Sequence, residues 1–342
     1  MHNEYKCRAM FALDGKRAVR DELLIVNGIA YIEGDLKLVH LRILLAIIGQ
    51  LQQAILYRIS RRKQASGYLL PAQLRMLTIP VSSFGMGKHD ATHLREYLDE
   101  LRRTAIVFPV FKTSSGEYTG QVNRYKGFIA DYDFPPYARE LSVTLPEGLV
   151  NRLLLIEEGY TSVSFSKSAS LTNKYTVRIY WLICAWRNRG GFIITVKELR
   201  RILCLSGAYS RFDNIVSRIL APSEKELEAS FPIWFHYRLY DNAGEKTLAF
   251  KILLHIDEEQ RKKEMNNAWD YCFNLLASIG VKLHTIQNIF ARLDYEDLRP
   301  FMNKIVSLTN HVRSHTSAIS DPDRYILSVM ESWFSNWLER YK

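Results

Sequence analysis

The sequence predicts an α+β protein in which two tandem winged-helix domains are followed by a C-terminal helical extension. Segments with helical periodicity and then β-rich segments follow one another in the same order over residues 35–156 and again over residues 157–256. This repeated order predicts two domains of one architecture, although the two copies share no obvious sequence similarity. Residues 257–342 show only helical patterns and predict the extension. Residues 1–34 predict an N-terminal arm with a short strand near Leu23–Val26.

The first domain is expected to begin with a long amphipathic helix over residues 36–59. A short helix is expected around Pro71–Leu77, with its proline near the first turn as helices prefer, and a third helix from His89 to Thr104. Three β-rich stretches then predict the wing: Ile106–Lys112, Gly120–Lys126 and Phe128–Tyr132. The strand Leu141–Leu145 and the helix Pro146–Leu155 are expected to connect the two domains.

The second domain is expected to contain helices over Ser170–Arg187, Val196–Leu205 and Ser210–Ala229. Gly190 and Gly191 break the first of these, and Thr195 is expected to cap the second, with Glu198 at the capping-box position. Two strands flank a turn at residues 241–244 and predict the second wing: Ile233–Tyr240 and Lys246–Ile256. Four helices are expected in the extension: Glu258–Ile279, Leu283–Arg292, Leu298–Val312 and Pro322–Leu338.

The charge of the chain favours a nucleic-acid-binding protein. The 342 residues carry a formal net charge of +10, with a sequence pI of about 9.3. Residues 257–342 hold 11 Lys/Arg and 12 Asp/Glu, so the whole positive excess lies in the first three quarters of the chain. Such a distribution is typical of proteins that bind a polyanion. A basic but unspecialised surface is the alternative explanation of the charge alone.

Several classes of protein are not expected. The four cysteines are far apart in the sequence and form no CxxC pair, so a structural zinc site is not expected: Cys7, Cys184, Cys204 and Cys272. The N-terminal segment lacks the apolar run of a signal peptide, and apolar stretches such as Leu41–Ile48 are too short to cross a bilayer. We therefore expect a cytoplasmic protein that does not contact a membrane and needs no cofactor.

The third helix of the second domain is the stronger candidate for a DNA recognition helix. At helical spacing, its apolar side chains gather on one side: Phe212, Ile215, Val216 and Ile219. Its polar side chains gather on the other: Ser210, Arg211, Asn214, Ser217 and Arg218. Arginine can form paired hydrogen bonds with guanine and asparagine with adenine, so Arg211, Asn214 and Arg218 suit base recognition, with Ser217 beside them. The alternative is an ordinary solvated face with two arginines.

The corresponding helix of the first domain is a less clear candidate. Leu94, Leu98 and Leu101 form its apolar stripe. Four residues near its N-terminus are candidates for DNA contact: Lys88, His89, Thr92 and Arg95. Three acidic residues follow and would repel DNA: Glu96, Asp99 and Glu100. We expect only the first half of this helix to reach the groove, and a solvated surface is again the alternative.

Basic residues outside the recognition helices are candidates for phosphate contact, which fixes the position of a protein on DNA without recognising sequence. The first wing offers three: Lys112, Arg124 and Lys126. The second wing offers Arg238 and Lys246, and the helix that opens the second domain offers Lys174 and Arg178.

The stretch Lys167–Ser230 carries a resemblance to a known family. Its features are the run of Tyr175, Arg178, Ile179 and Tyr180, the helix Val196-x-Glu198-Leu199-Arg200, the pair Tyr209-x-x-Phe212, the segment Arg218–Pro222, the pair Glu226-Leu227 and the strand motif Phe250-x-Ile252. In these features it is similar to the second winged helix of the Rep_3 family, the iteron-binding replication initiators of bacterial plasmids. The first domain resembles the family only in the order of its elements, and the segment after residue 257 has no counterpart in the resemblance.

The resemblance implies a function that the composition does not. Family members bind direct repeats in double-stranded DNA at a replication origin and help to open an adjacent A·T-rich segment. Dimers of many members bind an inverted repeat and repress their own gene. The resemblance implies as partners a second copy of the chain and host replication proteins, namely the initiator, the helicase and chaperones. It also implies DNA contact for Arg211, Asn214 and Arg218.

Two other functions are alternatives: a winged-helix transcriptional regulator with no role in replication, and an enzyme, namely a nickase of the rolling-circle type. The segment from Ser82 to His89 lacks the first glycine and the final Ser or Thr of a phosphate-binding loop, so ATP binding is not expected. His311 and His315 have the spacing of metal ligands on a helix but no third ligand nearby in the sequence. We therefore expect a protein that is not an enzyme.

Overall fold

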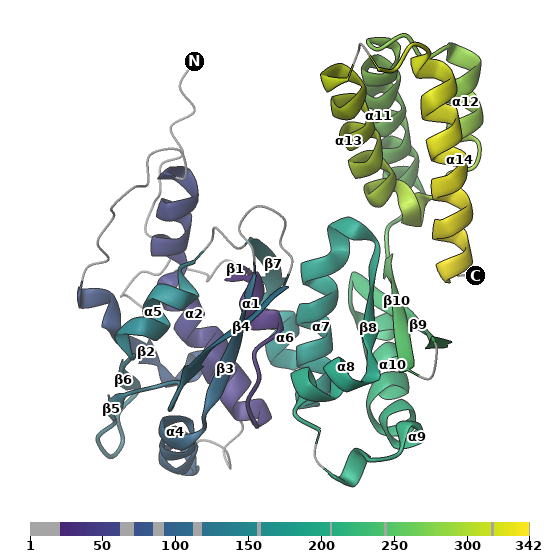
Figure 1. The fold of residues 1–342 in the computed structure, drawn as a ribbon. Coiled ribbons are helices and arrows are strands. Elements are labelled where there is room, and N and C mark those ends of the chain that lie inside the picture. The colour runs from purple at the N-terminus through teal and green to yellow at the C-terminus, as the bar shows by residue number, and fades with distance from the viewer. Residues whose placement is uncertain are drawn as a thin grey trace. The chain divides into compact units, whose positions relative to one another are not determined.

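The structure is a computed structural model that describes residues 21–61, 72–84, 92–111, 118–155, 159–205, 207–242, 245–315 and 318–341. The chain packs as two compact units (Figure 1). The first combines residues 1–185 with residues 197–223, and the second combines residues 186–196 with residues 224–342.

The first unit opens with strand β1 (Glu22–Val26), which pairs antiparallel with β7 (Tyr160–Ser164). The predicted N-terminal strand is therefore present. The buried side chain of Gln52 accepts the Leu24 N–H at 2.8 Å and donates to the Leu24 carbonyl at 2.9 Å. A side-chain amide thus supplies the hydrogen bonds that a further strand would supply, and it holds β1 against the next long helix.

That helix is α2 (Leu38–Arg61), which follows the short helix α1 (Asn27–Ala30). Its apolar residues recur at helical spacing as predicted, and those from Leu41 to Leu51 are almost all buried. The segment Leu38–Ile59 is long and apolar enough to cross a membrane. However, 72% of its 18-residue apolar stretch is buried inside the protein. Burial of this kind is what the core helix of a folded domain requires.

Strand β2 (Met76–Pro80) corrects one prediction. A helix was expected around Pro71–Leu77, but the described part of this segment is a 3-10 turn (Ala72–Arg75) followed by β2. Leu77 and Ile79 are buried while Met76 and Thr78 are exposed, which is the two-residue period of a strand. Strand β6 (Glu140–Thr144), expected as part of a connector, pairs with β2 on one side and with β5 (Asp131–Asp133) on the other.

The remaining elements of the first domain are close to their predicted positions. Helix α4 (Leu94–Arg103) buries Leu94, Leu98 and Leu101, the predicted stripe. Strands β3 (Ile106–Phe111) and β4 (Tyr118–Tyr125) form an antiparallel hairpin, the predicted wing. Helix α5 (Glu147–Leu153) follows β6.

The later elements of the first unit are mainly helical. Helix α6 (Phe165–Ser170) precedes α7 (Lys174–Trp186), whose side chains from Thr176 to Cys184 are all buried. Helix α8 (Val196–Leu203) and a 3-10 turn (Gly207–Tyr209) lead to α9 (Phe212–Ile215). The chain continues without a break through a π-helical turn (Val216–Leu220) into α10 (Ala221–Ser230).

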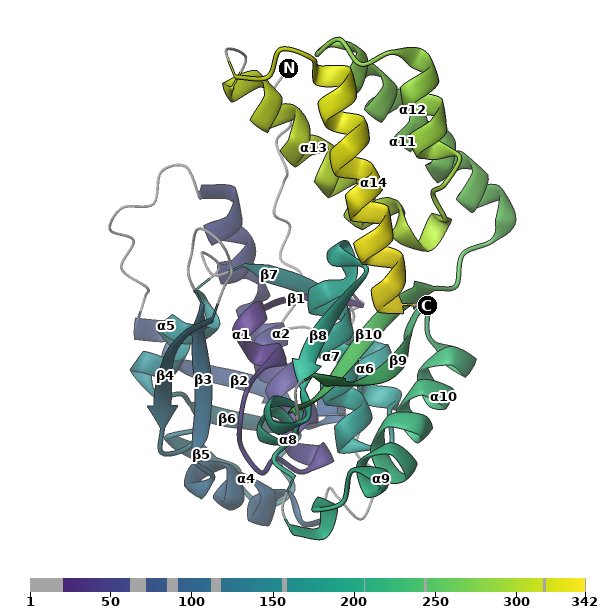
Figure 2. The same cartoon turned by 45° about the vertical axis from the view of Figure 1, so that its right-hand side comes forward.

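The second unit contains a three-stranded antiparallel sheet in the order β8 (Gly191–Thr195), β10 (Glu245–Leu254), β9 (Ile233–Asn242) (Figure 2). Phe192 and Phe250 stack at 4.7 Å between ring centroids on its buried face, and Phe235 packs beside them. The two long strands are the predicted second wing. Strand β8 was not predicted, because the sequence pattern indicates only a helix break at Gly190, which has a left-handed φ of 69°.

Four helices of the extension complete the second unit: α11 (Glu258–Ala277), α12 (Leu283–Phe290), α13 (Leu298–Ser314) and α14 (Pro322–Tyr341). All four were predicted, and they enclose a core of their own around Phe301 and Met330. The extension is fixed to the turn before β8, because the Asn188 side chain accepts from Arg299 at 3.1 Å and its carbonyl accepts from Asn303 at 2.9 Å.

Candidate nucleic-acid interface

The structure places the polar residues of the candidate recognition helix in the second domain as the amphipathic pattern requires. Arg211 is exposed and occupies the extended N-cap position of α9. Ser217 and Arg218 are exposed on the π-helical turn, and Asn214 is half-buried between them and Arg211. Ile215 and Ile219 are fully buried and anchor the opposite side. The segment therefore offers two guanidinium groups to a ligand while its apolar side holds it in the domain.

The π-helical turn was not predicted, and Pro222 gives its physical reason. The Ala221 N–H donates to the Val216 carbonyl five residues earlier. Pro222 has no N–H to continue an α-helical ladder, and its ring crowds the carbonyl four residues before it, which is that of Arg218. Turns of this kind are frequent at functional sites. Here the turn carries Ser217 and Arg218, so it sets the direction in which both side chains project.

Arg200 is a positioning residue that the sequence analysis missed as a site residue. Its guanidinium, on α8, donates to the Ser210 carbonyl at 2.6 Å, immediately before Arg211. Nearby, Tyr175 meets Tyr209 edge-on at 5.7 Å, and burial together with the hydrogen bond to Tyr209 raises the pKa of Tyr175, so this phenol stays protonated. These contacts fix the start of the recognition helix against α7 and α8.

Arg200→Ala is expected to lower affinity for a specific DNA site about tenfold, because Arg211 loses the carbonyl contact that fixes its position. Affinity for unrelated DNA should stay within about twofold, since no phosphate contact is removed. Competition binding assays with specific and unrelated duplexes measure both. Lys197→Ala, which removes an exposed charge from the same helix, is the control. An equal loss on both duplexes would contradict the positioning role.

The two candidates on α7 have different environments. Arg178 is buried, with 2% of its surface exposed, and its guanidinium donates to the carbonyls of Ile32 and Gly34. The prediction that Arg178 contacts the DNA backbone is therefore wrong for this fold, because the side chain has no access to a ligand. Lys174 is paired with Asp35 at 2.9 Å and is only partly exposed.

In the first domain, the described candidates are exposed but spread over several elements. Thr92 and Arg95 lie at the start of α4, and Arg95 donates to the Phe134 carbonyl at 2.7 Å. Arg124 and Lys126 are exposed at the end of β4. Lys88, His89 and Lys112 lie outside the described residues.

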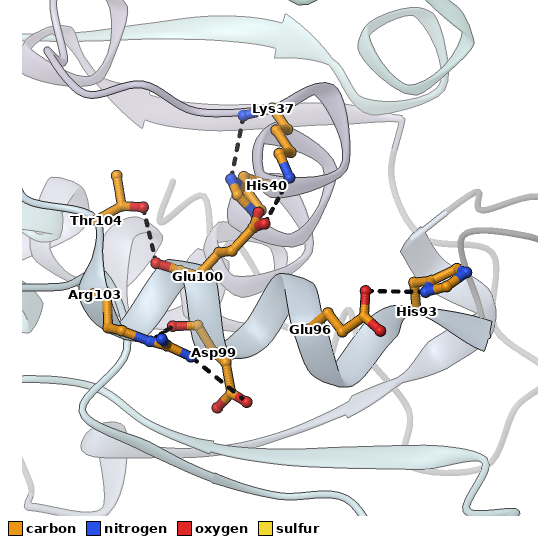
Figure 3. Close-up of polar contacts among 8 residues, drawn as sticks. All are labelled: Lys37, His40, His93, Glu96, Asp99, Glu100, Arg103 and Thr104. Atoms are coloured by element: carbon orange, nitrogen blue, oxygen red, sulfur yellow. Dashed lines mark hydrogen bonds and ion pairs between the residues drawn. The ribbon is translucent and has the colours of Figure 1, made fainter.

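The acidic residues of α4 all have partners (Figure 3). Glu96 contacts His93 at 3.0 Å, and Asp99 accepts a hydrogen bond from Tyr132 at 3.1 Å and lies 4.0 Å from Arg103. Since these carboxylates lie beside donors and cations, the repulsion of DNA expected from the sequence is reduced.

Glu100 points from α4 toward the start of α2, where it pairs with Lys37 at 2.6 Å and faces Nε2 of His40 at 3.2 Å (Figure 3). Nδ1 of His40 accepts the Lys37 N–H at 3.2 Å. His40 is 1% exposed, and burial lowers its pKa to about 4, with the nearby Glu100 carboxylate opposing that shift. The imidazole is therefore neutral at pH 7 and joins the long core helix to the candidate recognition helix.

The second wing carries its two candidates on neighbouring strands. Arg238 is exposed on β9 and lies over the ring of Tyr240, 5.4 Å from its centroid. Lys246 is exposed on β10, where its backbone is paired with Asp241 of β9. Both residues therefore remain candidates for contact with the phosphate backbone.

His311 and His315 stack at 4.2 Å between ring centroids. Among the residues that the structure describes, no group of three or more His, Cys, Asp or Glu is arranged to hold a metal ion.

Comparisons with known proteins give two family matches. Residues 26–184 match the model described as "Initiator Replication protein, WH1", and residues 195–254 match "Initiator Rep protein, WH2". The first match includes α7, which the sequence analysis assigned to the second domain. Among solved structures, the chain is similar to "Crystal structure of Pi initiator protein in complex with iteron DNA", with 13% identity and a TM-score of 0.43, over 69% of this chain and 98% of that chain. A search of curated protein sequences found no match.

Proposed function

Because the chain belongs to the initiator Rep protein family, whose two winged-helix models together match most of it, we propose that it initiates plasmid replication by binding repeated sequences in double-stranded origin DNA. Both winged-helix domains bind in this proposal, and binding promotes opening of the origin. The protein also represses its own gene from an operator that contains an inverted repeat.

The tandem family match carries the proposal. It is supported by the exposed guanidinium groups of Arg211 and Arg218, which stand on a helix whose opposite side is buried. An arginine so placed can form paired hydrogen bonds with guanine in the major groove. A transcriptional regulator without a replication role is not favoured, because both matched models describe replication initiators.

We further propose that the protein acts by binding alone, without cleaving DNA, in the cytoplasm, and that its partners are a second copy of the chain and host replication proteins. Opening a duplex next to an occupied array of sites needs deformation of the DNA and no covalent step. Incubation with supercoiled origin plasmid and Mg²⁺ tests this point. A covalent protein–DNA adduct would contradict it and favour the nickase.

A replication assay tests the central proposal. A non-replicating selectable fragment that carries the gene and its flanking DNA should transform a host as an autonomous plasmid. The same fragment with a stop codon in the gene should replicate only when the protein is supplied from elsewhere. A fragment that represses its own promoter but never replicates would identify a regulator. Footprinting should show protection over about two helical turns, since two recognition helices on one face of DNA lie about 34 Å apart.

Lys246→Ala is expected to weaken binding to specific and unrelated DNA by the same factor. A phosphate contact contributes no sequence preference, and its loss should lower the slope of log affinity against log salt by about 1. Titrations at several salt concentrations measure the slope. Lys263→Ala, an exposed lysine of α11, is the control and should leave the slope unchanged. A selective loss on specific DNA would assign Lys246 to base recognition instead.

A further inference from the structure

The short segment Ile32–Asp35 connects α1 to α2, and it is held by side chains from α7 and α8. The buried guanidinium of Arg178 donates to the carbonyls of Ile32 and Gly34, the latter at 3.2 Å. No carboxylate lies within ion-pair distance of this buried cation among the described residues. Burial disfavours the charged guanidinium, and the two carbonyls together with the nearby side chains of Cys204 and Glu33 oppose that cost.

Two contacts to α8 continue the pattern. The Gly34 N–H donates to the sulfur of Cys204 at 3.0 Å, and the Glu33 carboxylate forms an ion pair with Arg201. Both partners, Arg201 and Cys204, belong to the second family match, whereas Glu33 and Gly34 belong to the first. On α7, Lys174 pairs with Asp35. We name these contacts of residues 32–35 with α7 and α8 the interdomain clamp.

The opposite side of the same segment is fixed to the first domain. The Glu33 N–H donates to the Val107 carbonyl and the Val107 N–H donates to the Glu33 carbonyl, both at 2.9 Å. Val107 is on β3, the first strand of the first wing. A side chain at Gly34 would be crowded, because an added Cβ would lie 3.1 Å from the Ile106 side chain and 3.2 Å from the Ala105 carbonyl. Glu33 therefore holds β3 through its backbone and α8 through its side chain.

The segment also connects to the two recognition helices. It leads directly into α2, whose first turn holds α4 through the contacts of Lys37 and His40 with Glu100. Helix α8 carries Arg201 of the clamp and, one residue earlier, Arg200, which holds the carbonyl before Arg211. A continuous set of contacts within the first unit therefore runs from α4 to the start of α9.

We infer that the interdomain clamp determines the spacing at which the two domains recognise their two blocks of sequence within one DNA site, with Arg178, Arg201 and Glu33 as positioning residues. The inference rests on the proposed function, since it requires both domains to bind one site. Adding one base pair between the two blocks increases the distance between them by about 3.4 Å. It also rotates one block by about 34–36° relative to the other. A protein whose domains are rigidly connected must lose DNA contacts or deform the DNA to bind a site with altered spacing. A protein whose domains are loosely connected can adjust to the new spacing without this cost.

The experiment uses the full chain and its natural site, with the two protected blocks first located by footprinting. Duplexes with one base pair inserted or deleted between the blocks are then compared with the natural spacing. Wild-type affinity should fall at least about tenfold on either altered duplex. Glu33→Gln removes a partly buried carboxylate from the clamp and Asp35→Asn removes an exposed one, and each should reduce this spacing penalty about threefold or more. Their affinity for the natural spacing should stay within about threefold of wild type.

The matched control is Glu296→Gln. It removes the ion pair between Arg261 and Glu296, whose charged atoms lie 2.5 Å apart. This pair is also partly buried, but it lies in the extension, within the second unit. It should keep the full spacing penalty. Clamp variants that are folded by circular dichroism and keep the wild-type penalty would overturn the inference, as would a wild-type protein indifferent to spacing. Protection of one block only, or no specific binding, would instead overturn the two-domain proposal on which the inference rests.

Discussion

Arg218→Ala is expected to lower affinity for the specific site by about 1–3 kcal/mol, which is about 5-fold to 150-fold in Kd. The guanidinium is exposed on the π-helical turn, and the buried Ile219 beside it holds the backbone in place. Truncation therefore removes donors from the interface without creating a cavity. Sequence preference should relax at one or two neighbouring base pairs only, because one side chain can recognise no more than that.

Titrations of Arg218→Ala against the natural site and single-base variants of it measure both effects. Lys225→Ala is the matched control, because Lys225 is exposed two turns further along the same helical segment and carries the same charge. Arg211→Ala should behave like Arg218→Ala but affect a different base pair. An Arg218→Ala protein that binds the natural site as tightly as wild type would remove this helix from the interface.

The elements that the sequence predicted well are those whose boundaries have strong local causes. Helix α11 begins at Asp257, whose carboxylate accepts the Gln260 N–H at 2.7 Å, and helix α14 begins at Pro322, as expected. The stripe of Leu94, Leu98 and Leu101 on α4 is buried as its period requires. In such segments the local preferences agree with the burial that the tertiary structure imposes.

The predictions that failed depended on non-local pairing. Residues 76–80 alternate in burial only because they pair with residues 140–144, more than 60 positions later in the chain. Strand β8 has five residues and is defined by its pairing with β10. Short segments of this kind have no reliable pattern of their own, because the partner strand decides which face is buried.

Arg178 is an exception to the rule that charged side chains lie on the protein surface. A charged side chain on a helix is usually solvated, so a contact with DNA was a reasonable expectation. The residues around Arg178 indicate that it is buried, because Val177, Ile179 and the following residues leave α7 without a polar face. A charge on a helix that is apolar on all sides must be buried with partners. Those partners are backbone carbonyls of residues 32 and 34, which no side-chain pattern could have identified.

His40→Asn is expected to remove a pH dependence of stability that reaches about 3 kcal/mol in the wild type. Burial lowers the pKa of His40 to about 4 in the folded protein, whereas an unfolded histidine titrates near 6.5. Between these values the unfolded state binds the additional proton, so the free energy of unfolding rises as pH rises from about 4 to about 6.5. Above that range His40 is neutral in both states and contributes no further dependence.

Urea unfolding followed by circular dichroism at pH 7.5, 5.5 and 4.5 measures the effect. Asparagine retains a short acceptor for the Lys37 N–H but does not titrate, so the variant should lose most of the acid sensitivity that wild type shows. His311→Asn is the control, since it replaces an exposed histidine and should leave the pH profile as in wild type. A wild-type free energy of unfolding that does not change between pH 7.5 and pH 4.5 would mean that His40 protonates in the folded state as easily as in water. That result would contradict the burial of His40 in this fold.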